Sequence, residues 1–131
     1  MFYIFIGSVL VLYLLACCLF YLFQGKMLFK RTKLPLNYRY HYEWPFKEIN
    51  WETEDGNKIN GILFEHESPK AILLFLHGNS GHMGRSGNYF ARVKEYPISV
   101  LLYDYQGYGK SSGTPTQKNL YSDVLFVYDW I

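Results

Sequence analysis

Two glycine-rich segments are the places where this chain could do chemistry. The first, residues 77–81 with the sequence HGNSG, directly follows the apolar run at residues 71–76. The second, residues 106–113, comes after another apolar run, residues 98–103, and Asp104. Glycine-rich turns at the carboxyl ends of buried parallel strands expose backbone N–H groups where open α/β sheets bind ligands. Such N–H groups can stabilise an oxyanion or hold a phosphate.

Residues 109–113 of the second segment match the sequence pattern of a serine nucleophile turn, G-x-S-x-G. That turn requires the first glycine to follow a strand at once and a helix to begin at the serine. Here the expected strand ends near Asp104, and Pro115 prolongs the loop where the helix should begin. The spacing therefore disfavours Ser111 as a nucleophile. A phosphate-binding P-loop is excluded as well, because Asp104 stands where that motif needs a glycine.

Together the two segments resemble the α/β-hydrolase superfamily, and within it the membrane-anchored BEM46-like branch of serine hydrolases. The resemblance rests on ILLFLHGNSGHMGRS at residues 72–86 and LLYDYQGYGKSSGTPT at residues 101–116. The amino-terminal segment and the hairpin described below fit the same family. The resemblance implies hydrolysis of esters or thioesters by a Ser, Asp and His triad, without a metal or an organic cofactor.

The resemblance also implies roles for particular residues. In this family the residue after His-Gly contributes a backbone N–H to the oxyanion hole, which points to Asn79, with Ser80 as the second choice. His77 is expected to hold the turn through its ring nitrogens, because the triad histidine follows the nucleophile in the chain. Asp104 is expected to brace the same turn. The other residues expected to shape the turns are Gly78, Gly107 and Gly109.

The hydropathy pattern predicts the elements that position these turns. Residues 47–53 and 58–64 alternate between apolar and polar types around a Glu-Asp-Gly-Asn turn, which predicts a hairpin. The continuous apolar runs are typical of strands covered on both faces. A helix is predicted over residues 89–96, and Thr116 is expected to cap a last helix. Its apolar residues recur at steps of three and four: Leu120, Val124, Val127 and Ile131.

This order of elements predicts the α/β class, in which an antiparallel hairpin leads into parallel strands joined by right-handed crossover helices. The resemblance makes it the first half of an α/β-hydrolase fold. The strand at residues 71–76 then lacks the neighbour that carries the nucleophile, so an incomplete sheet with an open apolar edge is expected. The expected organisation is a transmembrane anchor at 1–25, a basic juxtamembrane and extended crossing segment at 26–46, and a partial hydrolase domain at 47–131.

The anchor is predicted from residues 2–23, which are all apolar or small and long enough to cross a hydrocarbon core of about 30 Å as a helix. No basic residue precedes this run, and the run is longer than the apolar core of a signal peptide. Both features favour a membrane anchor over a cleaved signal peptide. Four basic residues follow it: Lys26, Lys30, Arg31 and Lys33. They favour a single-pass protein with its carboxyl-terminal part in the cytoplasm, or they contact anionic head groups.

The amino-acid composition excludes several other classes of protein. The 131 residues are 50% apolar, which argues against disorder, and carry a formal net charge of +2 with both signs interspersed. No basic stripe of the kind that binds nucleic acid is present in the sequence. The two cysteines, Cys17 and Cys18, are adjacent within the apolar segment, so neither a disulfide scaffold nor a zinc module is expected.

The triad of such a hydrolase lies on later strands, in the order Ser, Asp, His, and residue 131 falls within the helix that leads to the first of them. The chain alone is therefore expected to be inactive. Three hypotheses follow. In the first, the chain is the amino-terminal portion of a membrane-anchored serine hydrolase whose remainder is truncated away or encoded separately. In the second, it is a non-catalytic remnant of an interrupted gene. In the third, it is a membrane-tethered module that binds a partner through its open strand edge.

Overall fold

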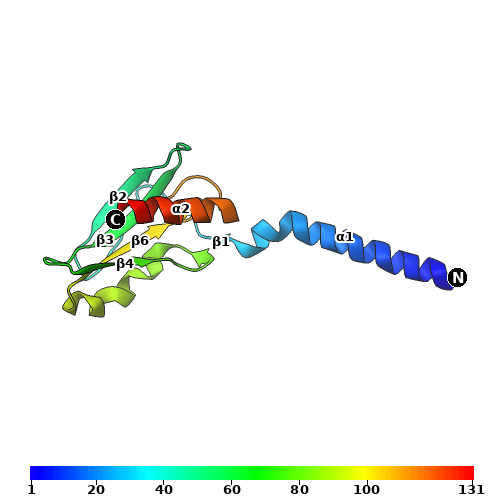
Figure 1. The fold of residues 1–131 in the computed structure, drawn as a ribbon, viewed down its shortest axis with the longest axis horizontal. Helices are drawn as coiled ribbons and strands as arrows, with labels where there is room; N and C mark the ends of the chain where they lie inside the picture. The colour runs from blue at the N-terminus through cyan, green and yellow to red at the C-terminus, as the bar shows by residue number, and fades with distance from the viewer.

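A computed structural model describes residues 1–131, apart from the side chain of Ala91. One long helix, α1 (Phe2–Leu28), projects from an α/β domain that contains the rest of the chain (Figure 1). None of the 27 residues of α1 is buried. Its most apolar window has a mean hydropathy of 2.5, so α1 is long and apolar enough to cross a membrane.

The domain is built on a four-stranded mixed sheet. Its strands are β2 (Lys47–Glu52), β3 (Lys58–Phe64), β6 (Ile98–Asp104) and β4 (Ala71–Phe75), adjacent in that order. The β2–β3 hairpin and the parallel β4–β6 pair confirm the predicted strands, and β3 pairs antiparallel with β6. The two glycine-rich segments therefore follow neighbouring parallel strands and lie together at the carboxyl ends of those strands.

Both faces of the sheet are covered, because successive side chains of a strand point to opposite faces. Val100 and Leu102 of β6 pack with Phe90 and with residues of the segment before β2. Leu101 and Tyr103 pack against α2 (Gln117–Trp130) through Val127. The predicted cap of α2 is confirmed, since Thr116 Oγ1 accepts a hydrogen bond of 3.1 Å from Asn119 N.

The segment between β4 and β6 differs from its prediction. In place of one α-helix over residues 89–96, the chain forms two 3₁₀ helices, η1 (Met83–Arg85) and η2 (Gly87–Glu95), joined to β4 through a short strand, β5 (Ser80–Gly81). Gly84 and Gly87 have poor α-helical propensity. The rings of Tyr40 and Tyr42 also approach these two glycines so closely that a Cβ would overlap them. Tertiary packing and glycine content thus favour the tighter, shorter turns.

β4 is less covered than its continuous apolar sequence predicts. It has a hydrogen-bonded neighbour on one side only, and Ile72 and Leu73 remain 41% and 36% exposed. The reason is positional, because the core that includes α2 takes its buried strand residues from β2, β3 and β6, while β4 is the outermost strand. The expected open apolar edge is therefore present.

Residues 29–46 pack onto the domain although they have no regular pattern in the sequence. The short strand β1 (Lys30–Arg31) pairs in parallel with β5, and Lys33 forms an isolated bridge with Gly109. Tyr40 and Trp44 are buried, and the Trp44 ring stacks on Phe64 with ring centroids 5.3 Å apart. The segment that connects α1 to the sheet is thus part of the core.

Candidate active site

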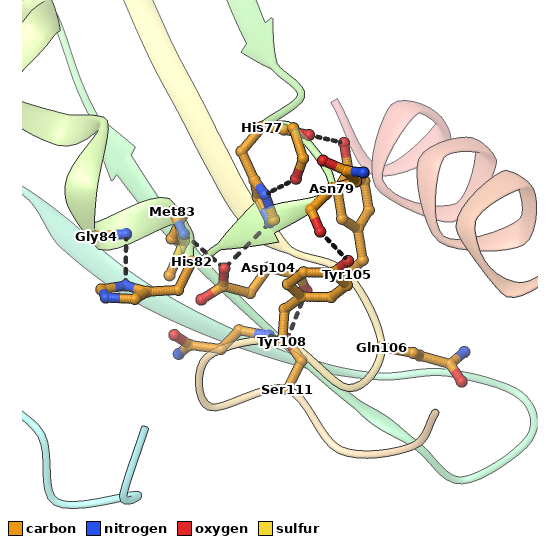
Figure 2. A network of polar contacts seen from close by, with 12 residues as sticks. His77, Asn79, His82, Met83, Gly84, Asp104, Tyr105, Gln106, Tyr108 and Ser111 are labelled. Carbon is orange, nitrogen blue, oxygen red and sulfur yellow. Dashed lines mark hydrogen bonds and ion pairs between the residues drawn. The ribbon is translucent and has the colours of Figure 1, made fainter. Parts of the chain in front are cut away.

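The two glycine-rich segments meet at the carboxyl ends of β4 and β6 (Figure 2). Two tyrosines, one just before the second segment and one within it, reach across to the first segment. The Tyr105 hydroxyl donates to His77 O at 2.8 Å, and the Tyr108 hydroxyl donates to Asn79 O at 2.9 Å. Both phenol rings also contact the His77 ring, with centroids 4.5 and 5.2 Å away. The turn formed by His77, Gly78 and Asn79, called the HGN turn below, is therefore held by hydrogen bonds to two of its carbonyl groups.

Both hydroxyls carry their protons at neutral pH, as tyrosines ordinarily do. Burial moves each pKa further up, to about 12 for Tyr105, so the two hydroxyls remain donors in alkaline solution as well. Neither residue is predicted as a site residue from the sequence. The only signal is that aromatic residues flank Gly107 in a turn directly after a buried strand, and this does not say which carbonyls they contact.

The peptide between Gly78 and Asn79 has a defined orientation. His77 Nδ1 lies 2.7 Å from Gly78 O, and because a carbonyl oxygen only accepts, Nδ1 carries the proton in this contact. In a planar trans peptide the N–H points away from the C=O, so the Asn79 N–H is directed away from the His77 ring. Among the described residues this N–H donates no hydrogen bond, and Gly78 and Asn79 are exposed. A ligand oxygen can reach it.

His77 is supported from its other side by Asp104. Its Nε2 lies 3.3 Å from Asp104 Oδ1, and both side chains are buried. The same carboxylate oxygen accepts a hydrogen bond of 2.6 Å from Met83 N, which ties the end of β6 to η1. The Nε2 atom makes no hydrogen bond among the described residues, so its contact with Asp104 is one of proximity in a buried site. The imidazole is enclosed between Gly78 O and the Asp104 carboxylate, which supports a bracing role for both residues.

Two glycines give the second turn its close contacts, one against Asp104 and one within the turn itself. Gly109 has a φ of 45°, and a Cβ there would overlap Asp104 Oδ2. Gly107 has a φ of 86°, and a Cβ there would overlap Pro115. Positive φ is strained for residues with a side chain, so both positions require glycine.

Ser111 lies beneath the turn and not in an exposed elbow. It is completely buried, its hydroxyl donates to Asp104 O at 2.6 Å, and its Oγ accepts from Asn60 N at 2.9 Å. Both bonds hold the second turn against β3 and β6. A nucleophile needs an accessible Oγ beside a base, and Ser111 has neither.

Ser80, near the end of the first segment, and His82, just after it, have other contacts. Ser80 is exposed in β5, where it pairs with Lys30 of β1. His82 Nδ1 accepts a hydrogen bond of 3.1 Å from Gly84 N and so caps η1. Burial lowers the pKa of His82, which favours the neutral ring that this contact needs.

A second polar cluster joins the second turn to α2. Asp123 is buried and accepts hydrogen bonds from Gln106 N at 2.8 Å and from Gln106 Nε2 at 2.9 Å. Asn119 donates to Gln106 Oε1 at 3.1 Å. Figure 2 shows the Gln106 side chain pointing away from the Asp104 cluster. These contacts position the turn, and no sequence motif points to them.

Among the described residues, no group of three or more His, Cys, Asp or Glu side chains is placed to hold a metal ion.

Known proteins share this sequence and fold. A family model described as "Serine aminopeptidase, S33" matches residues 67–126. Human alpha/beta hydrolase domain-containing protein 17B is 41% identical over 75 residues, which are 55% of this chain and 26% of that protein. Protein 17C of Xenopus laevis is 34% identical over 100 residues, covering 70% of this chain and 32% of the relative. Lysophosphatidylserine lipase ABHD12 of Danio rerio is 38% identical over 87 residues, covering 62% of this chain and 22% of that lipase.

The chain thus spans between about a fifth and a third of the length of these curated relatives. Among solved structures, the esterase Pf2001 of Pyrococcus furiosus has the same fold in two crystal forms. The TM-scores are 0.51 and 0.52 at 23% and 21% identity, covering 76% and 78% of this chain and 42% of the esterase. The strand order, the two glycine-rich turns and these likenesses show that the chain belongs to the α/β-hydrolase superfamily.

Proposed function

We propose that this chain supplies the membrane anchor and the oxyanion-hole portion of a serine hydrolase that acts on carboxylic esters or thioesters. The observation that carries the proposal is the backbone N–H of the exposed residue Asn79, which has no hydrogen-bond acceptor among the described residues and follows the end of β4. Its peptide is oriented by the His77 ring, and the neighbouring carbonyls are held by Tyr105 and Tyr108.

The chemical role follows from this geometry. When a serine attacks an acyl carbon, the carbonyl oxygen becomes an oxyanion, and N–H groups already aimed at it stabilise the transition state without reorganisation. The Asn79 N–H is one such donor, and the Ser80 N–H is the second candidate in this turn. His77 and Asp104 act as positioning residues beneath the turn and do not exchange protons with the substrate.

The nucleophile, acid and base of the reaction are proposed to come from outside residues 1–131. The G-x-S-x-G serine of this chain, Ser111, is buried and fully hydrogen-bonded. The outward edge of β4, where Ile72 and Leu73 are exposed, offers unpaired backbone groups for a further strand. The 131 residues alone are therefore proposed to be inactive, and a segment or chain carrying the triad is proposed to pair with β4.

The anchor and substrate class are part of the same proposal. α1 fits a single membrane crossing, and Lys26, Lys30 and Arg31 at its carboxyl-terminal end favour a cytoplasmic domain. The ester class is supported by the name of the zebrafish relative, a lysophosphatidylserine lipase. The same combination of anchor and HGN turn supports the BEM46-like branch of the superfamily.

The test is a chimera in which this chain continues into the remainder of human protein 17B after the region the two share. It is read by labelling with a fluorophosphonate probe and by hydrolysis of a p-nitrophenyl ester. The chimera is expected to be labelled and active. Asn79→Pro, which removes the N–H, is expected to reduce kcat by about 10² to 10³-fold, the usual effect of losing one oxyanion donor.

The matched control is Asn79→Ala, which keeps the backbone N–H and loses only the side chain. It is expected to retain most of the activity, and circular dichroism of both variants checks that the domain stays folded. Equal losses of kcat in folded proline and alanine variants would contradict the role of the N–H. Absence of labelling in a folded chimera would contradict the hydrolase proposal itself.

A further inference from the structure

We infer that the end of α1 holds the HGN turn at the membrane surface, so that the acyl bond to be cleaved belongs to a membrane-resident amphiphile and lies at head-group depth. The inference deepens the proposed function and rests on it, because it takes α1 as a membrane span. It concerns where the site stands relative to the bilayer, which neither the family likeness nor the hydropathy of α1 determines.

The turn is bonded directly to the last turn of the helix. Asn79 Nδ2 donates a hydrogen bond of 2.9 Å to Leu28 O, the carbonyl of the final residue of α1. The next residues along the chain continue the contact, since Lys30 N donates to Asn79 O at 3.0 Å and Thr32 N donates to Gly81 O at 3.0 Å. No spacer therefore separates the candidate oxyanion donor from the membrane helix.

The attachment is repeated on the second glycine-rich segment, so the domain cannot swing freely about the helix end. Leu34 N donates to Gly109 O and Gly109 N donates to Thr32 O, both at 2.9 Å. Lys33 Nζ also donates to Ser111 O at 2.6 Å. A flexible linker would make no such ladder. Figure 1 shows β1 between the end of α1 and the sheet.

The length of the helix sets the depth of the turn. The uncharged apolar run ends at Phe23, five residues before Leu28. At 1.5 Å per residue this places the Leu28 carbonyl about 7 to 8 Å beyond the apolar run. The head-group layer of each leaflet is about 5 to 8 Å thick, because a bilayer core of about 30 Å is about 40 to 45 Å with its head groups. Asn79 then lies within or just outside this layer.

The charges around the turn suit that position. Lys26, Lys30 and Arg31 are exposed at or just after the end of α1. The Arg85 side chain lies beside Gly81 of β5, the strand that pairs with β1. Basic residues near an anionic membrane surface are attracted to it. A soluble ester would gain nothing from this placement, whereas an acyl chain in the bilayer presents its ester or thioester bond at this depth.

The experiment measures depth by fluorescence quenching in the full chain, reconstituted into vesicles of phosphatidylcholine with phosphatidylglycerol. Three single-cysteine variants carry the same fluorophore: one keeps Cys17 alone, and two replace both native cysteines by alanine and carry Ser80→Cys or Ser68→Cys. Ser80 and Ser68 are both exposed. Ser80 follows the carboxyl end of β4, whereas Ser68 precedes its amino end and so lies at the opposite end of the strand. Nitroxide lipids quench either at the head group or deep in the acyl chains.

The expected result is deep quenching at position 17, head-group quenching at position 80, and quenching several-fold weaker at position 68. If position 17 is quenched but positions 80 and 68 are equally weak, the anchor stands and the placement of the turn at the surface is overturned. If position 17 is not quenched by the deep nitroxide, α1 is not a membrane span, and both the proposed anchor and this inference fail.

Discussion

Asp104 is a fully buried carboxylate whose two oxygens have different surroundings. Oδ1 accepts a hydrogen bond from Met83 N and faces His77 Nε2 at 3.3 Å. Oδ2 has no hydrogen-bond partner among the described residues and lies against Gly109. A buried charge in this position depends on its partners, because its desolvation is offset only by the contacts it keeps.

Asp104→Asn is therefore expected to lower the free energy of unfolding by about 3 kcal/mol, since it leaves His77 without its carboxylate. Urea unfolding of the full chain in detergent micelles, followed by circular dichroism, measures the change. Asp129→Asn on the exposed side of α2 is the control, with an expected change of less than about 0.5 kcal/mol. Equal effects of the two substitutions would remove the bracing role of Asp104.

Asp123 is expected to make stability depend on pH. Burial raises the pKa of its carboxyl, against the hydrogen bonds from Gln106 that lower it. The folded chain therefore binds the proton more tightly than the unfolded chain. From about pH 4 upward, through the raised pKa, this contribution to the free energy of unfolding falls as pH rises.

Asp123→Asn removes this titration. The free energy of unfolding of the original chain, minus that of the variant, is expected to decrease as pH increases through this window. Urea unfolding at a series of pH values provides the measurement, with Asp129→Asn as the matched exposed change. A difference that stays constant, or that grows with pH, would show that the Asp123 pKa is not raised in the folded state.

At the scale of elements, the segment before β2 determines whether the sheet has a core on its second face. Trp44 is 7% exposed and stacks on Phe64 of β3, and Tyr40 is buried beside it. The segment has no helical or strand period, so its apolar residues could equally be exposed. Only its packing against β3 and β6 shows that it belongs to the domain.

Trp44→Ala is expected to lower the free energy of unfolding by about 3 to 5 kcal/mol, because it removes a large buried ring and leaves a cavity. Leu36→Ala, in the same segment but 82% exposed, is expected to change it by less than about 0.5 kcal/mol. Circular dichroism during urea unfolding distinguishes the two. A loose connecting segment would instead make both substitutions nearly neutral.

At the scale of the whole molecule, the open edge of β4 governs how the chain behaves in solution. Ile72 and Leu73 are exposed beside backbone groups that pair with no further strand among residues 1–131. An exposed apolar edge strand is a template for pairing with another chain. Self-association of the isolated chain follows from this arrangement.

Ile72→Lys is expected to shift the chain in detergent micelles from associated species towards the monomer, as measured by sedimentation velocity. A charge on an edge strand opposes edge-to-edge pairing. Tyr121→Lys, which changes an exposed residue of α2 away from any strand edge, is expected to leave the association unchanged. Association that responds equally to both variants would indicate general hydrophobic contact.

Several elements are predictable from the sequence because their signals are local. The alternation of residues 47–53 and 58–64 and the turn between them produce the hairpin, and the Thr116 cap begins α2. The apolar runs at 71–76 and 98–103 become β4 and β6, and the amino-terminal run becomes α1. In each case the side-chain period or the turn chemistry acts within a few residues.

By itself the sequence determined the four strands of the main sheet, and that two glycine-rich turns follow neighbouring strands. The short strands β1 and β5 have no signal in the sequence. Only the tertiary structure decided how the HGN turn is held, because its hydrogen bonds join residues far apart in the chain. Tyr108 contacts Asn79 across 29 positions, and Asn79 contacts Leu28 across 51. The burial of residues 29–46 and the 3₁₀ form of residues 83–95 likewise depend on packing, which no local pattern encodes.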